Sequence, residues 1–270
     1  MLKIRPFLKW AGSKYASLEI ILSSFPKAHR YIEPFAGSAA VFLNTHFENN
    51  VLAEENADVI NLFSFIKTEG QAFINYCEQF FTLKNNNKEQ YYLLREEFNV
   101  CVELRKRAAL FLYLNRHGYN GLCRYNSSGK YNVPFGRYKA PVFPRNALEI
   151  FYEKSQNTEL KHADFRITFA KAKKGDLIYC DPPYVPLQQT SNFTAYTDKQ
   201  FGEQEQIMLA ELAKDCASRG ITVVISNHDT EFTRHYYKEG KILSFPVQRH
   251  ISCKPSMRKS VSELIAIFAS

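Results

Sequence analysis

The pattern of hydrophobic positions along this chain alternates between short apolar runs and longer amphipathic segments. The short runs cover residues 30–35, 51–53, 160–163, 176–180 and 221–225. Runs of this length, closed by turn-forming or polar residues, are typical of buried strands. Amphipathic segments that predict helices cover residues 15–25, 40–47, 144–155 and 203–218. Strands that alternate with helices in this way predict an α/β fold with a doubly wound, mostly parallel sheet.

The middle of the chain departs from this alternation. Residues 57–115 have a helical pattern, clearest over 90–100 and 104–115, and residues 118–141 are rich in Gly, Asn, Ser and Pro. A turn at 126–129, flanked by residues 122–125 and 130–135, predicts a hairpin. A helix is expected after Asn227, up to Glu239, and two last strands near 242–248 and 261–268. We therefore expect one domain from residues 1–56 and 145–270, with residues 57–144 inserted as a second domain.

Composition narrows the class of protein only modestly. The chain has 270 residues, of which 45% are hydrophobic and 23% charged, as in ordinary globular proteins. No apolar run approaches the roughly 20 residues that span a bilayer, and the N-terminus lacks a signal-peptide apolar region, so a cytoplasmic location is expected. The six cysteines form no Cys-x-x-Cys pair and no His pair has zinc spacing. Reduced, mostly buried thiols and no metal site are therefore expected.

Charge is distributed unevenly. The net charge is +8, yet no Asp or Glu occurs between Leu104 and Leu148. That segment carries nine positive charges, at Arg105, Lys106, Arg107, Arg116, Arg124, Lys130, Arg137, Lys139 and Arg145, so the rest of the chain sums to −1. Aromatic residues are interleaved with them, among them Tyr119, Tyr125, Tyr131, Phe135 and Tyr138. Basic and aromatic residues together favour a nucleic-acid surface over the alternative, a merely solvated basic face.

The most distinctive chemistry follows the run at 176–180, where Asp181-Pro182-Pro183-Tyr184 stands at the end of a predicted strand. Each proline biases the residue before it to an extended conformation, and Pro182 has no N–H, so its carbonyl acts purely as an acceptor. A stiff corner with a carboxylate, a carbonyl and an aromatic ring suits an exocyclic amino group on a planar base. The alternative is a tight turn with a solvated Asp and a packed Tyr.

Further candidate ligands follow the other predicted strands. Phe35-Ala36-Gly37-Ser38-Ala39 is a small-residue turn that lets a ligand approach the backbone, and Glu54 lies roughly 20 residues on, where an acid typically binds ribose hydroxyls. The GxGxxG pattern of dinucleotide-binding enzymes is absent. Asp164-Phe165 could bind an adenine amino group and stack on its ring. Ligands bind at the carboxyl ends of strands in such sheets.

Several motifs now occur in a specific order. They are Phe-Leu-Lys-Trp-x-Gly-x-Lys at 7–14, Glu-Pro-Phe-x-Gly at 33–37, the segment 113–126, Asn-Val-Pro-Phe-Gly-Arg-Tyr-Lys at 132–139, Asp-Pro-Pro-Tyr at 181–184, Asn-Phe-Thr-Ala-Tyr at 192–196 and Ile-Ser-Asn-His-Asp at 225–229. In this order they resemble the Dam family of DNA adenine-N6 methyltransferases over nearly the whole chain. The chain departs from the family at Ala39, where a second Gly is usual, and at Glu54, where Asp is usual.

The resemblance implies S-adenosylmethionine as cofactor and double-stranded DNA as partner, with a Rossmann-like methyltransferase fold and residues 57–144 as the DNA-recognition domain. The implied cofactor-binding residues are Trp10, Lys14, Phe35, Gly37, Glu54, Asp164, Phe165 and Asp181. Trp10 and Lys14 would enclose the cofactor, Gly37 would approach its methionine part, Glu54 would bind the ribose, and Asp164 and Phe165 the adenine. Trp10, as the only Trp, could instead belong to the core.

The resemblance also implies a catalytic set of Asp181, Pro182 and Tyr184. Acceptance of both N–H bonds of adenine N6, by the Asp181 carboxylate and the Pro182 carbonyl, would aim the nitrogen lone pair at the methyl group. The base would be flipped out of the duplex onto Tyr184, and residues 193–196 could close over it. Cytosine-C5 methylation is disfavoured, because that chemistry needs an activated thiolate and no Pro-Cys dipeptide occurs.

For sequence reading the resemblance implies the site GATC. The implied DNA-binding residues are Lys9, Arg95, Arg116, Tyr119, Asn120, Leu122, Arg124, Pro134, Arg137, Tyr138 and Lys139. Arg124 would contact a guanine bidentately and Lys9 another guanine, whereas Leu122 and Pro134 would contact thymine methyls. Tyr119 and Asn120 would enter the base stack, and Arg95, Arg116, Arg137 and Lys139 would bind phosphates.

Other functions stay open at this point. Methylation of cytosine N4, of RNA or of a protein amide would use related chemistry, although cytosine-N4 enzymes more often have Ser at the position of Asp181. A DNA-binding regulator on an inactive methyltransferase fold is a different class, and the intact Asp181 and Tyr184 argue against it. The chain is expected to act as a monomer or as a weak dimer on DNA.

Overall fold

The computed structural model describes residues 3–139, 141–184, 201–248 and 260–270. By packing, the chain divides into two compact units. Unit 1 comprises Met1–Leu18, Ala36–His46 and Val51–Ala163, and unit 2 comprises Glu19–Phe35, Phe47–Asn50 and Asp164–Ser270. The loop at 193–196, expected to close over the base, lies outside the described residues. The functional division at residues 57 and 144 stays a prediction.

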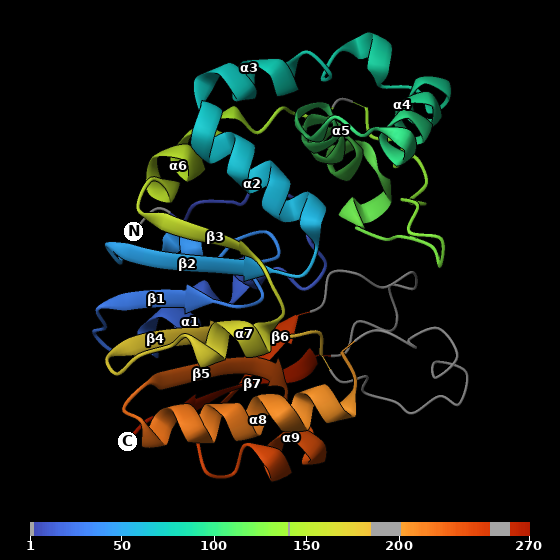
Figure 1. The fold of residues 1–270 in the computed structure, drawn as a ribbon. Helices are drawn as coiled ribbons and strands as arrows, with labels where there is room; N and C mark the ends of the chain where they lie inside the picture. The colour runs from blue at the N-terminus through green and yellow to red at the C-terminus, as the bar shows by residue number, and fades with distance from the viewer. Residues whose placement is uncertain (1–2, 140, 185–200, 249–259) are drawn as a thin grey trace. The chain divides into compact units, whose positions relative to one another are not determined.

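A seven-stranded sheet has the order β3-β2-β1-β4-β5-β7-β6 (Figure 1). Its strands are β1 (Arg30–Glu33), β2 (Asn49–Glu54), β3 (Thr158–His162), β4 (Asp176–Cys180), β5 (Thr222–His228), β6 (Lys241–Gln248) and β7 (Ser260–Phe268). Strand β4 pairs in parallel with both β1 and β5, whereas β7 is antiparallel to both β5 and β6. The predicted α/β fold with a mostly parallel sheet is confirmed.

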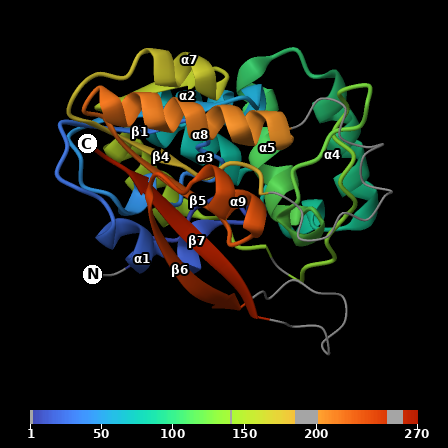
Figure 2. The same cartoon turned by 90° about the horizontal axis from the view of Figure 1, so that it is seen from below.

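In unit 2 the largely apolar run at residues 176–180 forms the buried strand β4. Every residue of β4 is buried, and the strand has parallel neighbours on both edges, β1 and β5. The helices are α1 (Leu18–Ser23), α7 (Phe165–Ala170), α8 (Glu203–Ser218) and α9 (Glu231–Tyr236). Helix α8 packs against β5 and β7. Figure 2 shows β6 and β7 as a long antiparallel ribbon.

Unit 1 contains a group of helices around α5. They are α2 (Ala57–Glu69), α3 (Gln71–Glu78), α4 (Lys88–Val100), α5 (Leu104–His117) and α6 (Arg145–Ser155), with 3-10 turns at Lys14–Ala16, Phe42–Asn44, Leu83–Asn85 and Tyr119–Gly121. All residues of α5 from Ala108 to Asn115 are buried, since α2, α3 and α4 pack against it. Asn56 and Asn87 cap α2 and α4 by accepting backbone N–H bonds, which begins these helices where the sequence predicts them.

The helix expected over residues 40–47 is wrong. Only the 3-10 turn Phe42–Asn44 forms there. Ala39 has a φ of +55°, so the backbone enters the segment in a left-handed conformation that a helix cannot continue. The Asn44 side chain donates to the Ala40 carbonyl at 2.8 Å and to the Ile4 carbonyl at 2.9 Å. A side chain therefore satisfies backbone groups that a helix would have paired.

Other boundaries differ from the expectation in smaller ways. The predicted helix at 15–25 is a 3-10 turn followed by the short helix α1. The helix expected between Asn227 and Glu239 is shorter at both ends, because it runs from Glu231 to Tyr236. Helix α7 was not expected; it begins after Asp164, which caps it. The predicted hairpin forms, but its arms pair as a bridge at Tyr125 and Tyr131 instead of as regular strands.

Candidate active site

The Asp181 side chain is oriented from the neighbouring strand. Asp181 follows β4 directly and is partly buried, and the Ser226 hydroxyl of β5 donates to its Oδ1 at 3.0 Å. The same hydroxyl lies 3.0 Å from the Tyr179 hydroxyl and 3.3 Å from the Cys180 carbonyl oxygen. Because strand β5 extends to His228, three residues beyond its predicted end, Ser226 is held within the sheet. The sheet thus sets the direction of the carboxylate.

Tyr184 is held by side chains from the two neighbouring strands. Its ring meets the His228 ring edge-on, with centroids 4.6 Å apart, and its hydroxyl donates to Glu263 Oε2 at 3.4 Å. His228 and Glu263 lie opposite each other in the pairing of β5 with β7. Burial, followed by the nearby carboxylates of Asp181 and Glu263, raises the pKa of Tyr184 well above its ordinary value. The phenol therefore stays neutral.

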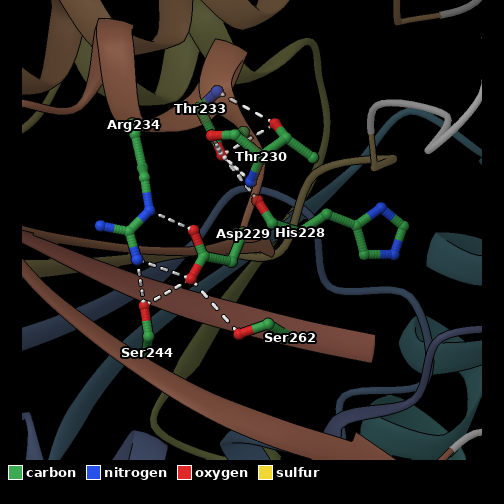
Figure 3. A network of polar contacts seen from close by, with 7 residues as sticks. All are labelled: His228, Asp229, Thr230, Thr233, Arg234, Ser244 and Ser262. Carbon is green, nitrogen blue, oxygen red and sulfur yellow. Dashed lines mark hydrogen bonds and ion pairs between the residues drawn. The ribbon is translucent and has the colours of Figure 1, made fainter. Parts of the chain in front are cut away.

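A polar network fixes the end of β5 where His228 stands (Figure 3). The Asp229 carboxylate accepts hydrogen bonds from Arg234 Nη2 at 2.8 Å, from the Ser244 hydroxyl at 2.6 Å and from the Ser262 hydroxyl at 3.3 Å. Arg234 is the main cause of a lowered pKa at Asp229. In Figure 3 the His228 ring points away from this cluster. The network joins α9, β6 and β7 to β5 and leaves the His228 ring to pack on Tyr184.

Three phenylalanines cluster in unit 2. The rings of Phe35 and Phe165 stack at 5.4 Å, and Phe201 lies 5.3 Å from Phe35 and 5.4 Å from Phe165. Phe201 had no sequence signal that singled it out, since it stands alone before α8.

Asp164 accepts from the Arg166 backbone N–H and pairs with its guanidinium at 2.6 Å, which lowers the pKa of the carboxyl.

In unit 1 the small-residue turn contacts two other predicted cofactor residues, Glu54 and Trp10. The Gly37 N–H donates to Glu54 Oε2 at 2.9 Å, and the Asn56 N–H donates to Glu54 Oε1 at 3.0 Å. Burial raises the pKa of Glu54, and these two hydrogen bonds oppose the shift. Gly37 has a φ of +48°, and a Cβ there would lie 2.7 Å from Trp10 Nε1. Only glycine fits beneath Trp10 in this conformation.

The remaining unit 1 residues of the predicted cofactor set differ in exposure. Trp10 is only partly buried, which argues against a purely core role. Lys14 is buried, and its Nζ donates to the Gly12 carbonyl at 2.6 Å.

The hairpin and the turn before it present several of the predicted DNA-binding residues to solvent. Tyr119, Asn120, Arg124 and Pro134 are exposed, whereas Leu122 is partly buried. The Tyr119 N–H donates to the Pro134 carbonyl at 2.8 Å, which ties the turn to the far arm of the hairpin. Arg124 Nε donates to Asn132 Oδ1 at 2.7 Å across the hairpin. Its guanidinium is thereby oriented before any ligand binds.

Lys9 is attached to the same region. Its backbone exchanges two hydrogen bonds of 2.8 Å with the Asn115 side chain, and its Nζ donates to the Arg116 carbonyl at 3.0 Å. The ammonium lies 3.5 Å from the centroid of the Tyr138 ring. Burial, and secondarily the charge of Arg116, lowers the pKa of Lys9 to about 8. The structure thus brings Lys9, Arg116 and Tyr138 together, as expected for residues of one surface.

The nine positive charges of the acid-free segment are not equally available. Four of them pair with carboxylates from outside the segment: Arg105 with Glu69, Lys106 with Glu97, Arg107 with Asp58 and Arg145 with Glu78. Arg116 is directed at the backbone carbonyls of Phe7 and Val142. Within the described part of the chain, the other four make no ion pair and are exposed: Arg124, Lys130, Arg137 and Lys139.

Arg95, which was expected to bind phosphate, is also engaged within the protein. It donates to the Val133 carbonyl at 3.3 Å and pairs with Glu96 at 3.3 Å. The exposed positive charges of the acid-free segment that form no ion pair among the described residues therefore lie within residues 124–139. This is a narrower region than the whole segment between Leu104 and Leu148.

The described cysteines, potential metal ligands and apolar helices are the other features that bear on the class of protein. The five described cysteines are free, and burial raises the pKa of the Cys180 thiol well above its ordinary value, so it is no thiolate nucleophile. In the ranges that the structure describes, no cluster of His, Cys, Asp and Glu could hold a metal ion. Over the same ranges, none of the helices combines the length and the apolar character needed to cross a bilayer.

An Asp-Pro-Pro-Tyr corner at the carboxyl end of a central parallel strand, together with a basic hairpin, defines a methyltransferase that acts on amino groups of nucleic-acid bases. The chain belongs to the D12 class N6 adenine-specific DNA methyltransferases, whose family model matches residues 10–251. It is therefore an enzyme that methylates adenine in DNA.

Full-length relatives agree with this assignment. The chain is 48% identical over 272 residues to a DNA adenine methylase of Haemophilus influenzae, covering 100% of this chain and 95% of the relative. It is 47% identical over 268 residues to the DNA adenine methylase of Salmonella typhi and 46% identical over 268 residues to that of Escherichia coli K12. In both cases 99% of this chain and 96% of the relative are covered. The recognition of the Dam family from sequence is confirmed.

Proposed function

We propose that this enzyme transfers a methyl group from S-adenosylmethionine to adenine N6 within GATC in double-stranded DNA, after the adenine has been flipped out of the duplex. The observation that carries the proposal is the Asp181–Tyr184 corner, whose carboxylate is oriented by Ser226 and whose ring is braced by His228 and Glu263. An oriented acceptor beside a braced aromatic ring is what a planar base with an exocyclic amino group requires.

The residues proposed to bind the cofactor fit its chemistry. Glu54 is partly buried, and its two oxygens are oriented by backbone N–H groups, so its free lone pairs suit ribose hydroxyls. Gly37 permits close approach of a ligand to the backbone and lies against Trp10, and Trp10 and Lys14 belong to the same unit. Phe35 and Phe165 offer aromatic surface for a purine ring, and Asp164 retains acceptor capacity beside its bonds to Arg166. The bound cofactor supplies an electrophilic methyl group.

The protein's own contribution to the reaction is positioning and electrostatics. The adenine N6 lone pair is delocalised into the ring, which makes the amino group a poor nucleophile. Acceptance of its two N–H bonds by the Asp181 carboxylate and the Pro182 carbonyl localises the lone pair on nitrogen. These acceptors also stabilise the positive charge that develops on N6, and Asp181 can hold the proton that N6 releases. No covalent intermediate with the protein is needed.

Duplex DNA has to be opened for this geometry. An adenine inside the stack cannot reach the corner, so we propose flipping, with Tyr184 as the stacking surface and Tyr119 and Asn120 filling the vacated space. The exposure of Tyr119 and Asn120 supports this role. The proposed recognition domain, residues 57–144, contains the hairpin, where Arg124 would bind a guanine and Leu122 and Pro134 would meet thymine methyls. Lys9, which is hydrogen-bonded to Asn115 and Arg116 at the end of α5, would bind another guanine. Arg95, Arg116, Arg137, Tyr138 and Lys139 would contact the backbone.

The test is transfer of a radioactive methyl group from labelled S-adenosylmethionine to short duplexes. One duplex contains a single GATC, one has the same bases in scrambled order, and one has N6-methyladenine already at the target. We expect label only in the first duplex, as N6-methyladenine after digestion to nucleosides. Label in N4-methylcytosine would overturn the adenine assignment, and equal label in the scrambled duplex would overturn GATC. Absence of label in all three duplexes would overturn the proposed cofactor or the proposed activity.

A further inference from the structure

The two prolines of the Asp-Pro-Pro-Tyr corner create a problem of anchoring. Neither Pro182 nor Pro183 has a backbone N–H, so two successive residues cannot donate to the surrounding protein. The corner carries the acceptors of the proposed reaction, and small displacements of such groups cost rate steeply. A stiff loop without donors has to be held through its carbonyl oxygens by donors from elsewhere.

Gln206, in the first turn of α8, supplies such a donor. Its Nε2 donates to the Pro183 carbonyl at 2.6 Å, and the residue is 1% exposed. Sequence reasoning gave Gln206 no role, because it lies 23 residues beyond Pro183. The reverse orientation of this buried amide would cost free energy, because its oxygen would then face the Pro183 carbonyl oxygen, which is also an acceptor.

Two further buried groups determine which way the Gln206 amide points. Its Oε1 accepts from Asn227 Nδ2 at 3.0 Å and from the Tyr237 hydroxyl at 3.2 Å. Asn227 Nδ2 also donates to the Tyr237 hydroxyl at 3.1 Å, and Asn227 Oδ1 accepts the His228 N–H at 2.8 Å. Asn227 is fully buried and Tyr237 nearly so. With donors on its oxygen side, the Gln206 amide can only present its N–H group to Pro183.

We propose that Gln206, oriented by Asn227 and Tyr237, is a positioning residue for methyl transfer: it holds the Pro183 carbonyl so that the Pro182 carbonyl next to it remains directed at the target amino group. Gln206 does not touch the substrate in this arrangement. It acts through the Asp-Pro-Pro-Tyr corner, and the inference rests on the proposed function of that corner. Ser226 orients the carboxylate from β5, and Gln206 fixes the carbonyls from α8.

The experiment compares wild type with Gln206→Met and Gln206→Glu. Methionine keeps the length of the side chain and removes the donor. We expect the single-turnover rate of methyl transfer to fall about 10- to 100-fold, with KM for DNA and for S-adenosylmethionine within about threefold of wild type. Leu209→Val, a buried residue of the same helix, is the packing control and should leave the rate within about twofold.

Gln206→Glu separates positioning from general stability. A protonated glutamic acid can donate its O–H to the Pro183 carbonyl and accept from Asn227 and Tyr237, whereas the carboxylate cannot donate. The ratio of its rate to that of wild type should therefore fall as pH rises from 6 to 9, while the ratio for Gln206→Met stays flat. Among the described side chains hydrogen-bonded to Gln206 the titratable one is Tyr237, whose pKa burial raises, so it remains neutral over this range.

Each result decides the matter. A Gln206→Met enzyme with a wild-type rate, a loss confined to KM, or parallel pH ratios for the two variants would overturn the positioning role. A rate loss in Leu209→Val equal to that of Gln206→Met would make the effect one of stability and would overturn it too. Wild-type enzyme is measured alongside, so a failure of the proposed function would appear as absent transfer in wild type and would be distinguished from a failure of this inference.

Discussion

The position of a side chain in the site can depend on local sequence, while its direction depends on a neighbouring strand, as Asp181 shows. Asp181 is placed by the chain itself, because it follows a buried strand and precedes a proline. Its direction comes from Ser226 on the next strand. Ala39 shows the opposite case, where a residue occupies a left-handed conformation that favours glycine. Such a conformation costs roughly 1–2 kcal/mol for a residue with a Cβ, and here the buried turn at Gly37 maintains it.

At this scale, replacement of Asp181 by alanine should abolish most of the chemistry and spare binding. Removal of a charged acceptor from a preorganised site should lower the single-turnover rate by at least about 10²–10³-fold. The affinity for GATC duplex, measured by fluorescence anisotropy, should stay within about threefold. Ser226→Ala keeps the carboxylate and loses only its orienting donor, so its rate should lie between those of wild type and Asp181→Ala. Near-normal turnover in Asp181→Ala would show that the amino group is bound elsewhere.

Arg124 permits a second prediction, about sequence discrimination. Its guanidinium is exposed and oriented by Asn132, as a bidentate contact to guanine requires. Arg124→Ala should lose about 1–3 kcal/mol of discrimination at one base pair of the site. The ratio of kcat/KM for GATC to that for each single-base variant measures this loss. Lys130→Ala, on the same hairpin, should lower kcat/KM for all the sites by the same factor, if at all, and leave the ratios unchanged. The same uniform weakening by Arg124→Ala would mark Arg124 as a phosphate contact.

At the scale of elements, the hairpin of residues 122–135, proposed to recognise DNA, is anchored to helix α2 through the buried carboxylate of Asp58. The Tyr125 hydroxyl donates to Asp58 Oδ2 at 2.7 Å, and Arg107 of α5 holds both oxygens of Asp58 at 2.6 and 2.9 Å. Asp58 lies in the first turn of α2, four residues after Glu54. The arms pair at a bridge between Tyr125 and Tyr131, and a second bridge joins Gly118 to Phe135. The bond to Asp58 therefore supplements a pairing less extensive than that of a regular two-stranded ribbon.

Tyr125→Phe should therefore relax recognition as well as stability. The loss of a hydrogen bond to a charged group should lower the free energy of unfolding by about 1.5–3 kcal/mol, measured by urea denaturation. It should also reduce discrimination at the base pair read by Arg124. Tyr113→Phe is the matched control, because it loses a hydroxyl hydrogen bond to the Asn85 carbonyl, a group outside the hairpin. Unchanged discrimination in Tyr125→Phe would mean that the hairpin is held by its backbone alone.

Helix α5 also predicts a pH dependence of stability. Burial lowers the pKa of His117 to about 4, although its hydrogen bond to the Tyr113 carbonyl opposes the shift. Between this value and the unfolded pKa of about 6.5, the unfolded chain takes up a proton that the folded protein does not. Stability is therefore present above the unfolded pKa and is lost as pH falls towards 4.

His117→Asn, which keeps a donor for the Tyr113 carbonyl and does not titrate, isolates this contribution. Between pH 7.5 and 5, wild type should lose about 2 kcal/mol more unfolding free energy than the variant. His235→Asn, at an exposed position of α9, should leave the wild-type dependence unchanged. The measurement is urea unfolding at the two pH values, and equal losses in wild type and His117→Asn would show that His117 is protonated in the folded protein.

At the scale of the whole molecule, the charge distribution determines how strongly DNA binding depends on salt. Four of the nine positive charges of the basic segment pair with carboxylates, so at most five of them are available to phosphates. Each phosphate contact contributes a slope of about −0.9 to log K against log salt. The segment should therefore contribute no more than about −4.5, rather than the −8 that nine free charges would give.

Two single variants test this assignment of charges. Lys139→Gln removes an exposed, unpaired charge and should reduce the steepness of the salt dependence by about 0.9. Arg145→Gln removes a charge paired with Glu78 and should leave the slope unchanged. Both slopes are measured by anisotropy titrations with duplex DNA at salt concentrations between about 50 and 200 mM. Equal effects of the two substitutions would contradict the distinction that the ion pairs imply.

The sequence by itself determined the α/β class, the helices of residues 57–117, the Asp-Pro-Pro-Tyr corner and the family. These features depend on local patterns: the period of the apolar positions, the order of the short motifs and prolines that stiffen their neighbours. The tertiary structure alone decided that residues 40–47 form no helix, because the Asn44 side chain and the left-handed Ala39 act together with Ile4, 40 residues away.

The tertiary structure also decided which polar groups complete the site. Ser226, Glu263 and Gln206 reach the corner from β5, β7 and α8, and ion pairs with Asp58 and Glu69 neutralise charges that look free in the sequence. Hydrogen bonds and ion pairs depend on distances between residues far apart in the chain. No local period encodes those distances, so they become visible only once the strands and helices have packed.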